Sequence, residues 1–441
     1  MNARQSLLCL ASLLLASAAP AAPARVFRGL PLLAGTHDCS ANGVSNDGRV
    51  VVGHCDPSQP DPQQPSQLPV RWDPVQGVQG LGVLPDATDC SATAVSGDGA
   101  VVFGNCAFAS GTTDPFRWDA AHGMQDLGRL PGMSYCSVDA SRFVSLDGSV
   151  ATGDCSTATT SSEGFRWDAS GMHGLGFLAG DVNSHGGPVS SDGTFIVGES
   201  DSADYSTSEA YRWDAVHGMQ NLDALMGLPN CGAFLISSDG SVAAGECSDA
   251  DGSHEEAFRW DTANGIQGLG IPAQQTETFA EALSGDGSVV AFGADSGDGT
   301  PQLAFRWDAV NGSANLGMLA GFESCYTSSL SRDGALILGV CIQSLVNPAT
   351  FVWDAQNGMR DLRDALIGDG NDLTGWELPF APLLTPDGRI LVGSGAHTDH
   401  TEAWIAPEAS AAGEALAAFA CLGLLARRAG ARPPGPLRRR G

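Results

Sequence analysis

The sequence contains no lysine, so all 22 of its basic residues are arginines. Acidic residues number 50, and the net charge of −28 argues against binding to nucleic acid or to an anionic membrane surface, because both would be repelled. Catalytic signatures are also lacking: there is no nucleophile elbow, no phosphate-binding glycine loop and no zincin motif. These absences favour a binding or structural protein over an enzyme. The charge would suit cations or a basic partner, although solubility alone would also explain it.

Helical periodicity is missing as well, and the sequence has a repeat in its place. Two landmarks each occur eight times, at spacings of 45 to 54 residues. The first is a Ser/Thr-x-Asp-Gly turn, whose aspartates are Asp47, Asp98, Asp147, Asp192, Asp239, Asp286, Asp333 and Asp387. The second is an aromatic strand that contains Trp72, Trp118, Trp167, Trp213, Trp260, Trp307, Trp353 and Trp404.

Each repeat predicts four short strands, as the copy around Asp98 illustrates. A small-residue strand precedes the Asp-Gly turn and a β-branched strand follows it, because Asp-Gly supplies the positive φ of a tight hairpin. In the third strand Phe116 and Trp118 alternate with Arg117. A turn at Gly123 leads to the fourth strand. Four-stranded units of about 45 residues are typical of β-propeller blades.

Known repeat families resemble this unit. Its serine-x-aspartate-glycine turn and the Trp-Asp pair at the end of the third strand resemble the WD-repeat blade pattern. A closer resemblance is to the bacterial HAF extracellular repeat family, named for a histidine-alanine-phenylalanine tripeptide in the third strand. The corresponding tripeptides here are Glu256-Ala257-Phe258, Glu209-Ala210-Tyr211, Leu303-Ala304-Phe305 and Glu402-Ala403-Trp404. The resemblance covers residues 26–406 and implies an extracellular protein of unassigned activity.

The two ends of the repeat region complement each other. Residues 26–33 read as a fourth strand, whereas 376–385, 389–392 and 403–405 read as a first, second and third strand. Together they complete one blade and leave no open sheet edge. We therefore predict an all-β fold, an eight-bladed β-propeller of four-stranded blades closed by the N-terminal strand. A seven-bladed ring with one irregular unit is the alternative.

Residues 1–24 have the pattern of a secretory signal peptide. Arg4 precedes an apolar run from Leu7 to Leu15, and small residues end the segment at Ala24. A buried N-terminal helix is the alternative. The propeller is then expected to span residues 25–406, in a protein exported from the cytoplasm.

The tail, residues 407–441, forms a third segment. Pro407-Glu408-Ala409 is followed by an apolar stretch from Ala415 to Ala426 and by Arg427-Arg428. This order resembles the PEP-CTERM sorting signal, which implies handling by an exosortase-type enzyme and transient membrane contact through the tail. It also implies a location at the bacterial cell surface or in the extracellular matrix. A disordered basic tail is the alternative.

Ten cysteines of the repeat region occur in pairs placed around the Asp-Gly turns. Four of the five pairs are symmetric about the turn aspartate, and residues so placed face each other across a hairpin. Export also favours oxidation, and no Cys-x-x-Cys or four-ligand cluster supports zinc. The predicted within-blade disulfides are Cys39 with Cys55, Cys90 with Cys106, Cys136 with Cys155, Cys231 with Cys247, and Cys325 with Cys341. Three extra residues before Asp147 predict a bulge in the third repeat.

Acidic loops at the cysteine end of the repeats are the expected binding face, because variable loops on a rigid scaffold commonly carry function. Calcium is the one cofactor that the sequence suggests, since hard cations bind several clustered oxygens. Its candidate ligands are Asp249, Asp251, Glu255 and Glu256, and a solvated acidic loop is the alternative. Two weaker metal candidates are the segment 369–372 and the pair His397 and His400.

The arginine before the tryptophan recurs in six repeats and is predicted to pair with a carboxylate of a neighbouring blade or turn. Taken together, the sequence predicts a non-catalytic binding or structural module of the envelope or extracellular matrix. Its ligand would be an extracellular polysaccharide or a protein. A glycan-acting hydrolase or lyase on a propeller scaffold is the alternative.

Overall fold

The structure is a computed structural model, and it describes residues 26–59, 64–157, 161–296, 301–343, 347–380 and 382–407. The predicted signal peptide lies outside these residues, as do Glu408, Arg427 and Arg428 of the predicted sorting tail. Within the described ranges, no helix is long and apolar enough to cross a membrane.

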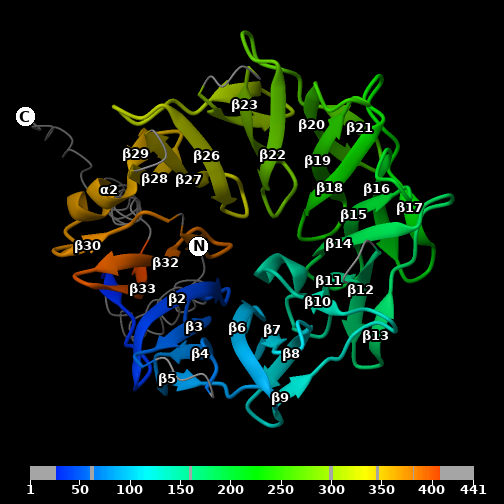
Figure 1. The fold of residues 1–441 in the computed structure, drawn as a ribbon. Helices are drawn as coiled ribbons and strands as arrows, with labels where there is room; N and C mark the ends of the chain where they lie inside the picture. The colour runs from blue at the N-terminus through cyan, green and yellow to red at the C-terminus, as the bar shows by residue number, and fades with distance from the viewer. Residues whose placement is uncertain are drawn as a thin grey trace, which may run out of the picture.

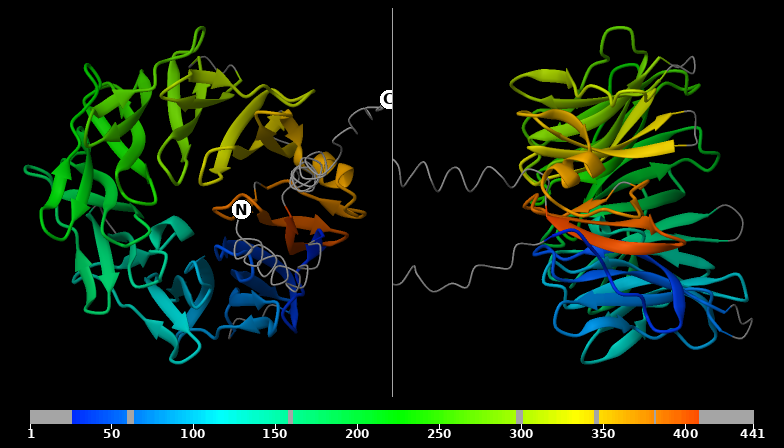
Figure 2. Two further views of the ribbon diagram at one scale, coloured as in Figure 1. Left: turned by 180° about the vertical axis from the view of Figure 1, so that it is seen from behind. Right: turned by 90° about the vertical axis from the view of Figure 1, so that its left-hand side faces the viewer.

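The described strands form antiparallel sheets that stand around a common axis, with the first strand of each unit innermost (Figure 1). The view from the side shows the ring as a thick disc (Figure 2). This arrangement confirms the predicted all-β propeller. The strand pairing divides the described strands into eight units, two of which are joined by one parallel bridge between Tyr135 and Thr113.

The first four units use the strands in chain order. They are β2 (Thr36–Val44), β3 (Val51–Pro57), β4 (Leu68–Asp73) and β5 (Gly77–Gly80); β6 (Ala87–Val95), β7 (Val101–Phe108), β8 (Thr113–Asp119) and β9 (Gly123–Asp126); β10 (Tyr135–Ser137), β11 (Ala151–Ser156), β12 (Ser162–Asp168) and β13 (Gly171–Gly174); and β14 (Asn183–Val189), β15 (Ile196–Asp201), β16 (Ser208–Asp214) and β17 (Gly218–Asn221).

The next three units follow the same order, and the last unit combines the two ends of the chain. They are β18 (Asn230–Ile236), β19 (Val242–Ser248), β20 (Glu255–Asp261) and β21 (Gly265–Gly268); β22 (Glu277–Leu283), β23 (Val289–Asp295), β24 (Leu303–Asp308) and β25 (Gly312–Asn315); β26 (Ser324–Leu330), β27 (Leu336–Gln343), β28 (Asn347–Asp354) and β29 (Gly358–Asp361); and β30 (Trp376–Glu377), β31 (Leu383–Leu384), β32 (Ile390–His397) and β33 (His400–Pro407) with β1 (Arg28–Gly29).

Close packing within each unit depends on a glycine of the second strand. Gly104 faces Phe116 across the ladder, and a Cβ atom on Gly104 would lie 2.1 Å from the Ser91 carbonyl oxygen and 2.7 Å from the Phe116 ring. Only a glycine therefore lets the phenylalanine lie flat across the second strand. Phe116 is fully buried and belongs to an apolar cluster that also contains Val52 of the preceding unit. The core thus lies between neighbouring blades.

All five predicted disulfides are bonded in the structure. In each pair the two cysteines are direct partners in the ladder between the first and second strands, as the symmetric spacing of four of the pairs predicts. The third pair differs from expectation in its turn. The three extra residues before Asp147 form a short 3₁₀ turn, Ser141–Phe143, rather than a bulge in a continuous strand.

The Ser/Thr-x-Asp-Gly turns are held in the same way in every unit. The Ser96 hydroxyl donates to Asp98 Oδ1 (2.6 Å), which also accepts from the Ala100 N–H, while the Val101 N–H donates to Ser96 Oγ. These bonds lower the pKa of the Asp98 carboxyl. The repeated Ser-x-Asp-Gly sequence is therefore explained by the turn itself.

Neighbouring turns are also joined to each other by backbone hydrogen bonds, which we call the turn belt. The N–H of the residue before the turn aspartate, or in one unit that of the aspartate itself, donates to a carbonyl of the next unit, and seven such bonds connect the eight units. Donors and acceptors are Asn46 to Gly97, Gly97 to Leu146, Leu146 to Ser191, Ser191 to Ser238, Ser238 to Gly285, Asp286 to Arg332, and Arg332 to Pro386. The eighth bond would need an N–H at Pro386, which proline lacks.

The closing unit is assembled as predicted, with β1 pairing antiparallel to β33 through Arg28 with Ile405 and Gly29 with Trp404. Its first strand is split into β30 and β31, since Pro379 and Pro382 in between cannot donate to a ladder.

The expectation that no helix interrupts the repeats was wrong. Helix α2 (Leu362–Gly368) precedes β30; Asp361 caps its N-terminus by accepting from the Asp364 N–H, and Leu362 and Leu366 are buried four residues apart. The 369–372 segment that follows is structural, since Asn371 Oδ1 accepts from the Phe27 N–H (2.8 Å).

The recurring arginine has a different partner from the one first expected. Arg306 binds Asp308 two residues further along the same strand (2.7 Å), and Arg71, Arg117, Arg166 and Arg259 bind the corresponding aspartates. The neighbouring blade supplies a carbonyl instead, as when Arg259 Nε donates to Gly287. Where the seventh repeat has Val352, Arg360 from the facing strand binds Asp354 (2.6 Å).

Candidate functional site

Three groups of polar side chains lie between or inside the blades: a row of seam residues, a pocket near the axis and a histidine cluster at the closing unit. The seam residues directly follow the second-strand glycine, at His54, Asn105, Asp154, Glu199, Glu246, Ala294, Val340 and Ser394. Several of them accept a backbone N–H from the next blade. Asn105 Oδ1 accepts from Val138, Asp154 Oδ1 from Gly186, and Ser394 Oγ from Ala41.

Three consecutive seams contain half-buried glutamates. Burial raises the pKa of Glu199 to about 7, and a Cβ on Gly232 of the next blade would lie 2.6 Å from its carboxylate. Burial, followed by the charge of Glu255, raises the pKa of Glu246 to about 8. In the next seam the equivalent position is Ala294, which has no polar side chain. Glu281 of the first strand contacts the next blade instead, by accepting from the Thr327 N–H (2.7 Å).

The Glu281 carboxylate also accepts from the Thr327 hydroxyl (2.6 Å) and from Gln302 Nε2 (2.7 Å), and burial raises its pKa to about 7. All of its partners belong to the blades that it joins. These glutamates are therefore explained by blade packing rather than by catalysis.

A pocket of about 560 Å³ lies against the inner parts of the eighth, first, second and third units. Its lining combines apolar and polar side chains from three parts of the chain: Ser40, Ala41, Asn42, His54, Thr93, Asp139, Phe380, Leu383, Val392, Gly393 and Ser394. The eighth unit is far from the first three in sequence and becomes their neighbour only when the ring closes.

Hydrogen bonds orient the polar groups of the pocket. Asn42 Nδ2 lies 2.9 Å from the Ala92 carbonyl oxygen and 3.3 Å from His54 Nδ1, which is also 3.2 Å from Ser91 Oγ. Burial lowers the pKa of His54, so that the imidazole is neutral at pH 7 and Nδ1 accepts while Nε2 carries the proton. Burial also raises the pKa of Asp139, and Phe380 keeps 59% of its surface exposed beside these groups.

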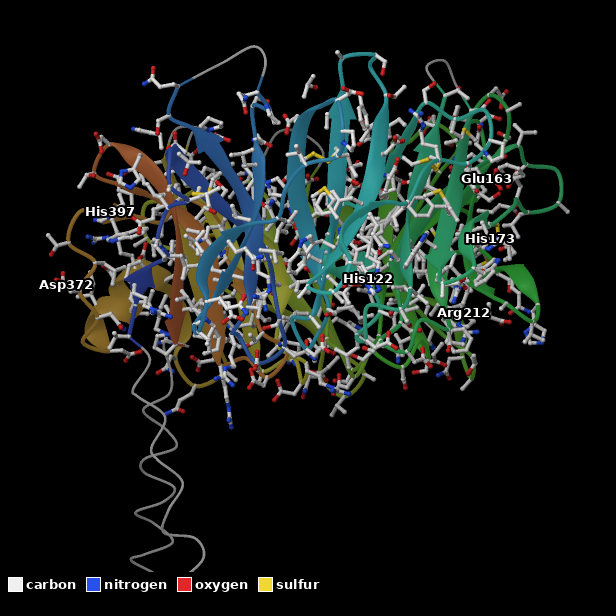
Figure 3. The ribbon with its side chains drawn as sticks, turned by 90° about the horizontal axis from the view of Figure 1, so that it is seen from below. His122, Glu163, His173, Arg212, Asp372 and His397 are labelled. Carbon is white, nitrogen blue, oxygen red and sulfur yellow. A yellow bond between two sulfur atoms is a disulfide. The ribbon has the colours of Figure 1, made fainter. Side chains whose placement is uncertain are left out.

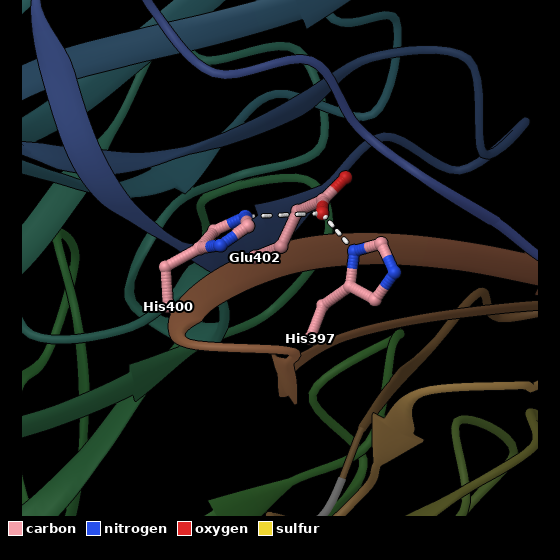
Figure 4. Close-up of side chains that lie close together, drawn as sticks. All are labelled: His397, His400 and Glu402. Atoms are coloured by element: carbon pink, nitrogen blue, oxygen red, sulfur yellow. Dashed lines mark hydrogen bonds and ion pairs between the residues drawn. The ribbon is translucent and has the colours of Figure 1, made fainter.

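The histidine cluster lies on the hairpin that joins β32 to β33 in the closing unit (Figure 4). His397 Nδ1 is 2.7 Å and His400 Nε2 is 3.4 Å from the same oxygen of Glu402. The Trp376 ring stacks on His397 with centroids 4.4 Å apart and planes 8° apart. His400 Nδ1 contacts Asp399 Oδ1 at 3.2 Å. The two histidines noted in the sequence thus converge with a carboxylate that spacing alone did not identify.

A second group of three, His185, Glu199 and Asp201, lies in the fourth unit. His185 Nδ1 faces Asp154 and Nε2 faces Asp201, both at 3.7 Å, while Ser162 Oγ is 3.2 Å from Nε2. Both ring nitrogens therefore already have partners, and the neighbouring Glu199 carboxyl has the raised pKa described above.

The calcium candidate is not assembled by the structure. Asp249 and Asp251 share one loop, where both accept from the Ser253 N–H. Glu255 and Glu256 are consecutive strand residues and point to opposite faces. Glu256 Oε1 accepts from the Gly270 N–H (3.0 Å), while Glu255 interacts with Glu246. The four carboxylates therefore do not converge on one point.

Comparison with known proteins shows the fold alone. Similar solved structures include the Dos1 propeller, with a TM-score of 0.52, 9% identity and coverage of 86% of this chain and 95% of that chain. A prolyl endopeptidase gives a TM-score of 0.52 at 11% identity and covers 82% of this chain, which spans 54% of that enzyme chain. An oligogalacturonate lyase in complex with manganese gives 0.47 at 13% identity, over 87% and 98% of the two chains. No protein-family model and no curated protein matches the sequence.

Proposed function

We propose that the chain is an extracellular binding protein without catalytic activity, and that it holds a sugar unit of a polysaccharide in the pocket near the ring axis. The observation that carries this proposal is the combination of exposed Phe380 with hydrogen-bonding side chains in one pocket of about 560 Å³. Ligand pockets commonly measure about 300 to 1,000 Å³.

The chemistry of the lining supports a polyhydroxylated ring. An exposed aromatic face can cover the apolar C–H face of a sugar, while Asn42, His54 and Ser394 offer both donors and acceptors to hydroxyl groups. The imidazole of His54 is neutral, and the raised pKa of Asp139 reduces the tendency of that carboxyl to ionise. The pocket therefore suits a neutral sugar better than a strongly charged ligand.

The alternative, a glycan-acting hydrolase or lyase, has less support from the pocket. Glycoside hydrolysis commonly needs two carboxyl groups on either side of the scissile bond. Among the described residues that line the pocket, Asp139 alone carries a carboxyl group. The half-buried glutamates Glu199, Glu246 and Glu281 contact neighbouring blades instead.

An extracellular location is part of the proposal. Five bonded cysteine pairs support folding in an oxidising compartment. The predicted signal peptide, the resemblance to HAF repeats and the PEP-CTERM-like tail supply the further expectation that the protein reaches the cell surface or the matrix.

The test is calorimetric titration of the full-length chain with a panel of oligosaccharides cut from extracellular polysaccharides, together with thermal unfolding. A ligand of the folded state must raise the melting temperature. Phe380→Ala should weaken binding at least tenfold, whereas Phe177→Ala, which removes an exposed phenylalanine away from the pocket, should not. Equal affinities of the two variants would overturn the proposal, and time-dependent shortening of the bound sugar would favour the enzyme.

A further inference from the structure

The closing unit carries a second site that shares no residue with the sugar pocket. We propose that His397, His400 and Glu402 bind one divalent transition-metal ion, with zinc as the ion that their chemistry favours. We further propose that this ion fastens the seam between the eighth and first units. The inference goes beyond the proposed sugar binding, because either site can fail without the other.

The three donors already point toward one place. Their ligand atoms lie within 4.8 Å of one another, with Glu402 Oε2 between the two imidazoles (Figure 4). A metal ion would take the place of the contact between His397 Nδ1 and Glu402 Oε2, which lie 2.7 Å apart. The hairpin geometry supports convergence, because His397 and His400 are direct partners across the turn.

Neighbouring groups fix the orientation of both imidazoles. Asp399 Oδ1 lies 3.2 Å from Nδ1 of His400, and a proton on this nitrogen would leave Nε2, which faces Glu402, for the proposed ion. A carboxylate behind a ligating histidine is a recurring feature of zinc sites, since it sets the tautomer and raises the basicity of the ring. Stacking on Trp376 holds the ring of His397 in place.

The ligand set decides which ions fit. Two imidazole nitrogens and one carboxylate suit zinc and related transition metals, whereas calcium prefers six to eight oxygen ligands. Three protein ligands leave a fourth position for a water molecule or for His37, whose exposed ring lies 5.8 Å from that of His400.

The site touches both sides of the closing seam. A Cβ on Gly29 of β1 would lie 1.9 Å from Glu402 Oε1, so the N-terminal strand packs directly on the ligand carboxylate. Asp38 of β2 accepts from the Thr401 N–H between two of the ligands (2.5 Å). An ion bound here would stiffen the β32–β33 hairpin, which contacts both β1 and β2. This hairpin lies at the seam between the eighth and first units, which is the one seam without a turn-belt hydrogen bond.

The cluster around His185 serves as a contrast within the same chain. It offers a single imidazole, and its two other groups are the carboxyls of Glu199 and Asp201. We therefore place the ion at the closing seam and not in the fourth unit.

The experiment titrates the full-length chain, stripped with chelator and dialysed, with zinc chloride. We expect one equivalent of zinc to bind, a higher melting temperature that chelator reverses, and loss of both effects in Glu402→Gln and His400→Gln. The control is His122→Asn, because asparagine occupies this turn position in other repeats and Figure 3 shows His122 well away from His397. Absence of binding in the wild type, or equal shifts in wild type and Glu402→Gln, would overturn the site.

Two measurements on the wild type do not depend on the folding of a variant. Cobalt in place of zinc should give visible absorption bands of a site with nitrogen and oxygen ligands, and the bands should disappear on adding zinc. Hydrogen exchange should become slower with zinc at the Thr401 and Leu30 amides, which bond across the seam and to β33. Unchanged exchange would overturn the role of the ion in fastening the ring.

Discussion

The closing seam and the other seams of the ring are held by different means. Between consecutive units the turn belt joins backbone to backbone, so the contact tolerates Asn46, Gly97 or Leu146 at the same position. At the closing seam Pro386 has no N–H to donate, so side-chain contacts of the kind that other seams also have occur there without a belt hydrogen bond. Within the closing unit Phe27 packs on Trp376 and Trp404, and across the seam Asp38 and Ser394 accept from the Thr401 and Ala41 N–H groups. Single side-chain substitutions should therefore weaken the closing seam more than they weaken the other seams.

The largest effect is expected for Phe27→Ala. Phe27 is 7% exposed, and its ring centroid lies 5.1 Å from Trp376 and 5.4 Å from Trp404. Removing a buried phenylalanine costs about 3 to 5 kcal/mol, which urea unfolding would measure. Hydrogen exchange should also rise first in β33. The control Phe103→Ala, at a fully buried ring in the second unit, should lower stability by a similar amount without that local opening.

Loss of one disulfide should rank next. Cys231 and Cys247 are 16 residues apart, and in the entropic description a bridge of this length contributes about 3 kcal/mol. The double replacement by serine should lower the free energy of unfolding by about 2 to 3 kcal/mol. It should leave exchange at β1 and β33 unchanged, because the pair lies within the fifth unit. Faster hydrogen exchange at β33 would contradict the expectation that a disulfide within one blade does not affect the closure of the ring.

A pH-dependent effect distinguishes a seam that holds a carboxylate from the closing seam, where the same position is Ser394. The pKa of Glu246 is raised from 4.5 to about 8, so the folded state holds this proton more tightly than the unfolded state. The contribution to stability is therefore complete below pH 4.5 and is lost as pH rises toward 8. Glu246→Gln should remove this loss and stabilise the protein by roughly 1 to 3 kcal/mol at pH 8, with little change at pH 4.

The measurement is urea unfolding of both proteins at several pH values. Exposed Glu323→Gln is the matched control and should leave the pH profile unaltered. If Glu246→Gln followed the wild-type profile, the buried carboxylate would not be the source of the dependence.

Sequence reasoning predicted most of the fold because the repeat supplies the same signal many times. The disulfides followed from symmetric spacing about each turn, and the ring closure followed from unmatched end segments such as residues 26–33. Helix α2 was missed because its seven residues offer only two buried leucines at helical spacing. The partner of the recurring arginines was also missed. A strand places residues two apart on the same face, so the nearest carboxylate is the aspartate two positions further along the same strand, and not one of a neighbouring blade.

The candidate sites were less predictable because they depend on which units become neighbours. The pocket joins Asn42, Asp139 and Phe380, which are far apart in the chain. Glu402 lies in a tripeptide that looks like any other third strand, and only the tight β32–β33 turn brings it to His397 and His400. The calcium candidate shows the converse, since closeness in sequence put Glu255 and Glu256 on opposite faces of a strand.

The smallest effect on stability is expected for a substitution at Pro386, which makes the closing seam resemble the other seams. Pro386→Ser would restore an N–H at the one turn that lacks it, and serine already occupies this position in the Asp192 and Asp239 turns. By the repeat pattern, the new N–H should donate to the Asn46 carbonyl and contribute about 0.5 to 1.5 kcal/mol. Losing proline should cost about 0.4 to 1 kcal/mol through the freer unfolded chain, so the net change in stability should be close to zero. The deciding measurement is hydrogen exchange at the new amide of position 386. Slow exchange would show that the turn belt can close. Rapid exchange would show that the side-chain contacts hold the two turns of the closing seam at a different spacing from the others.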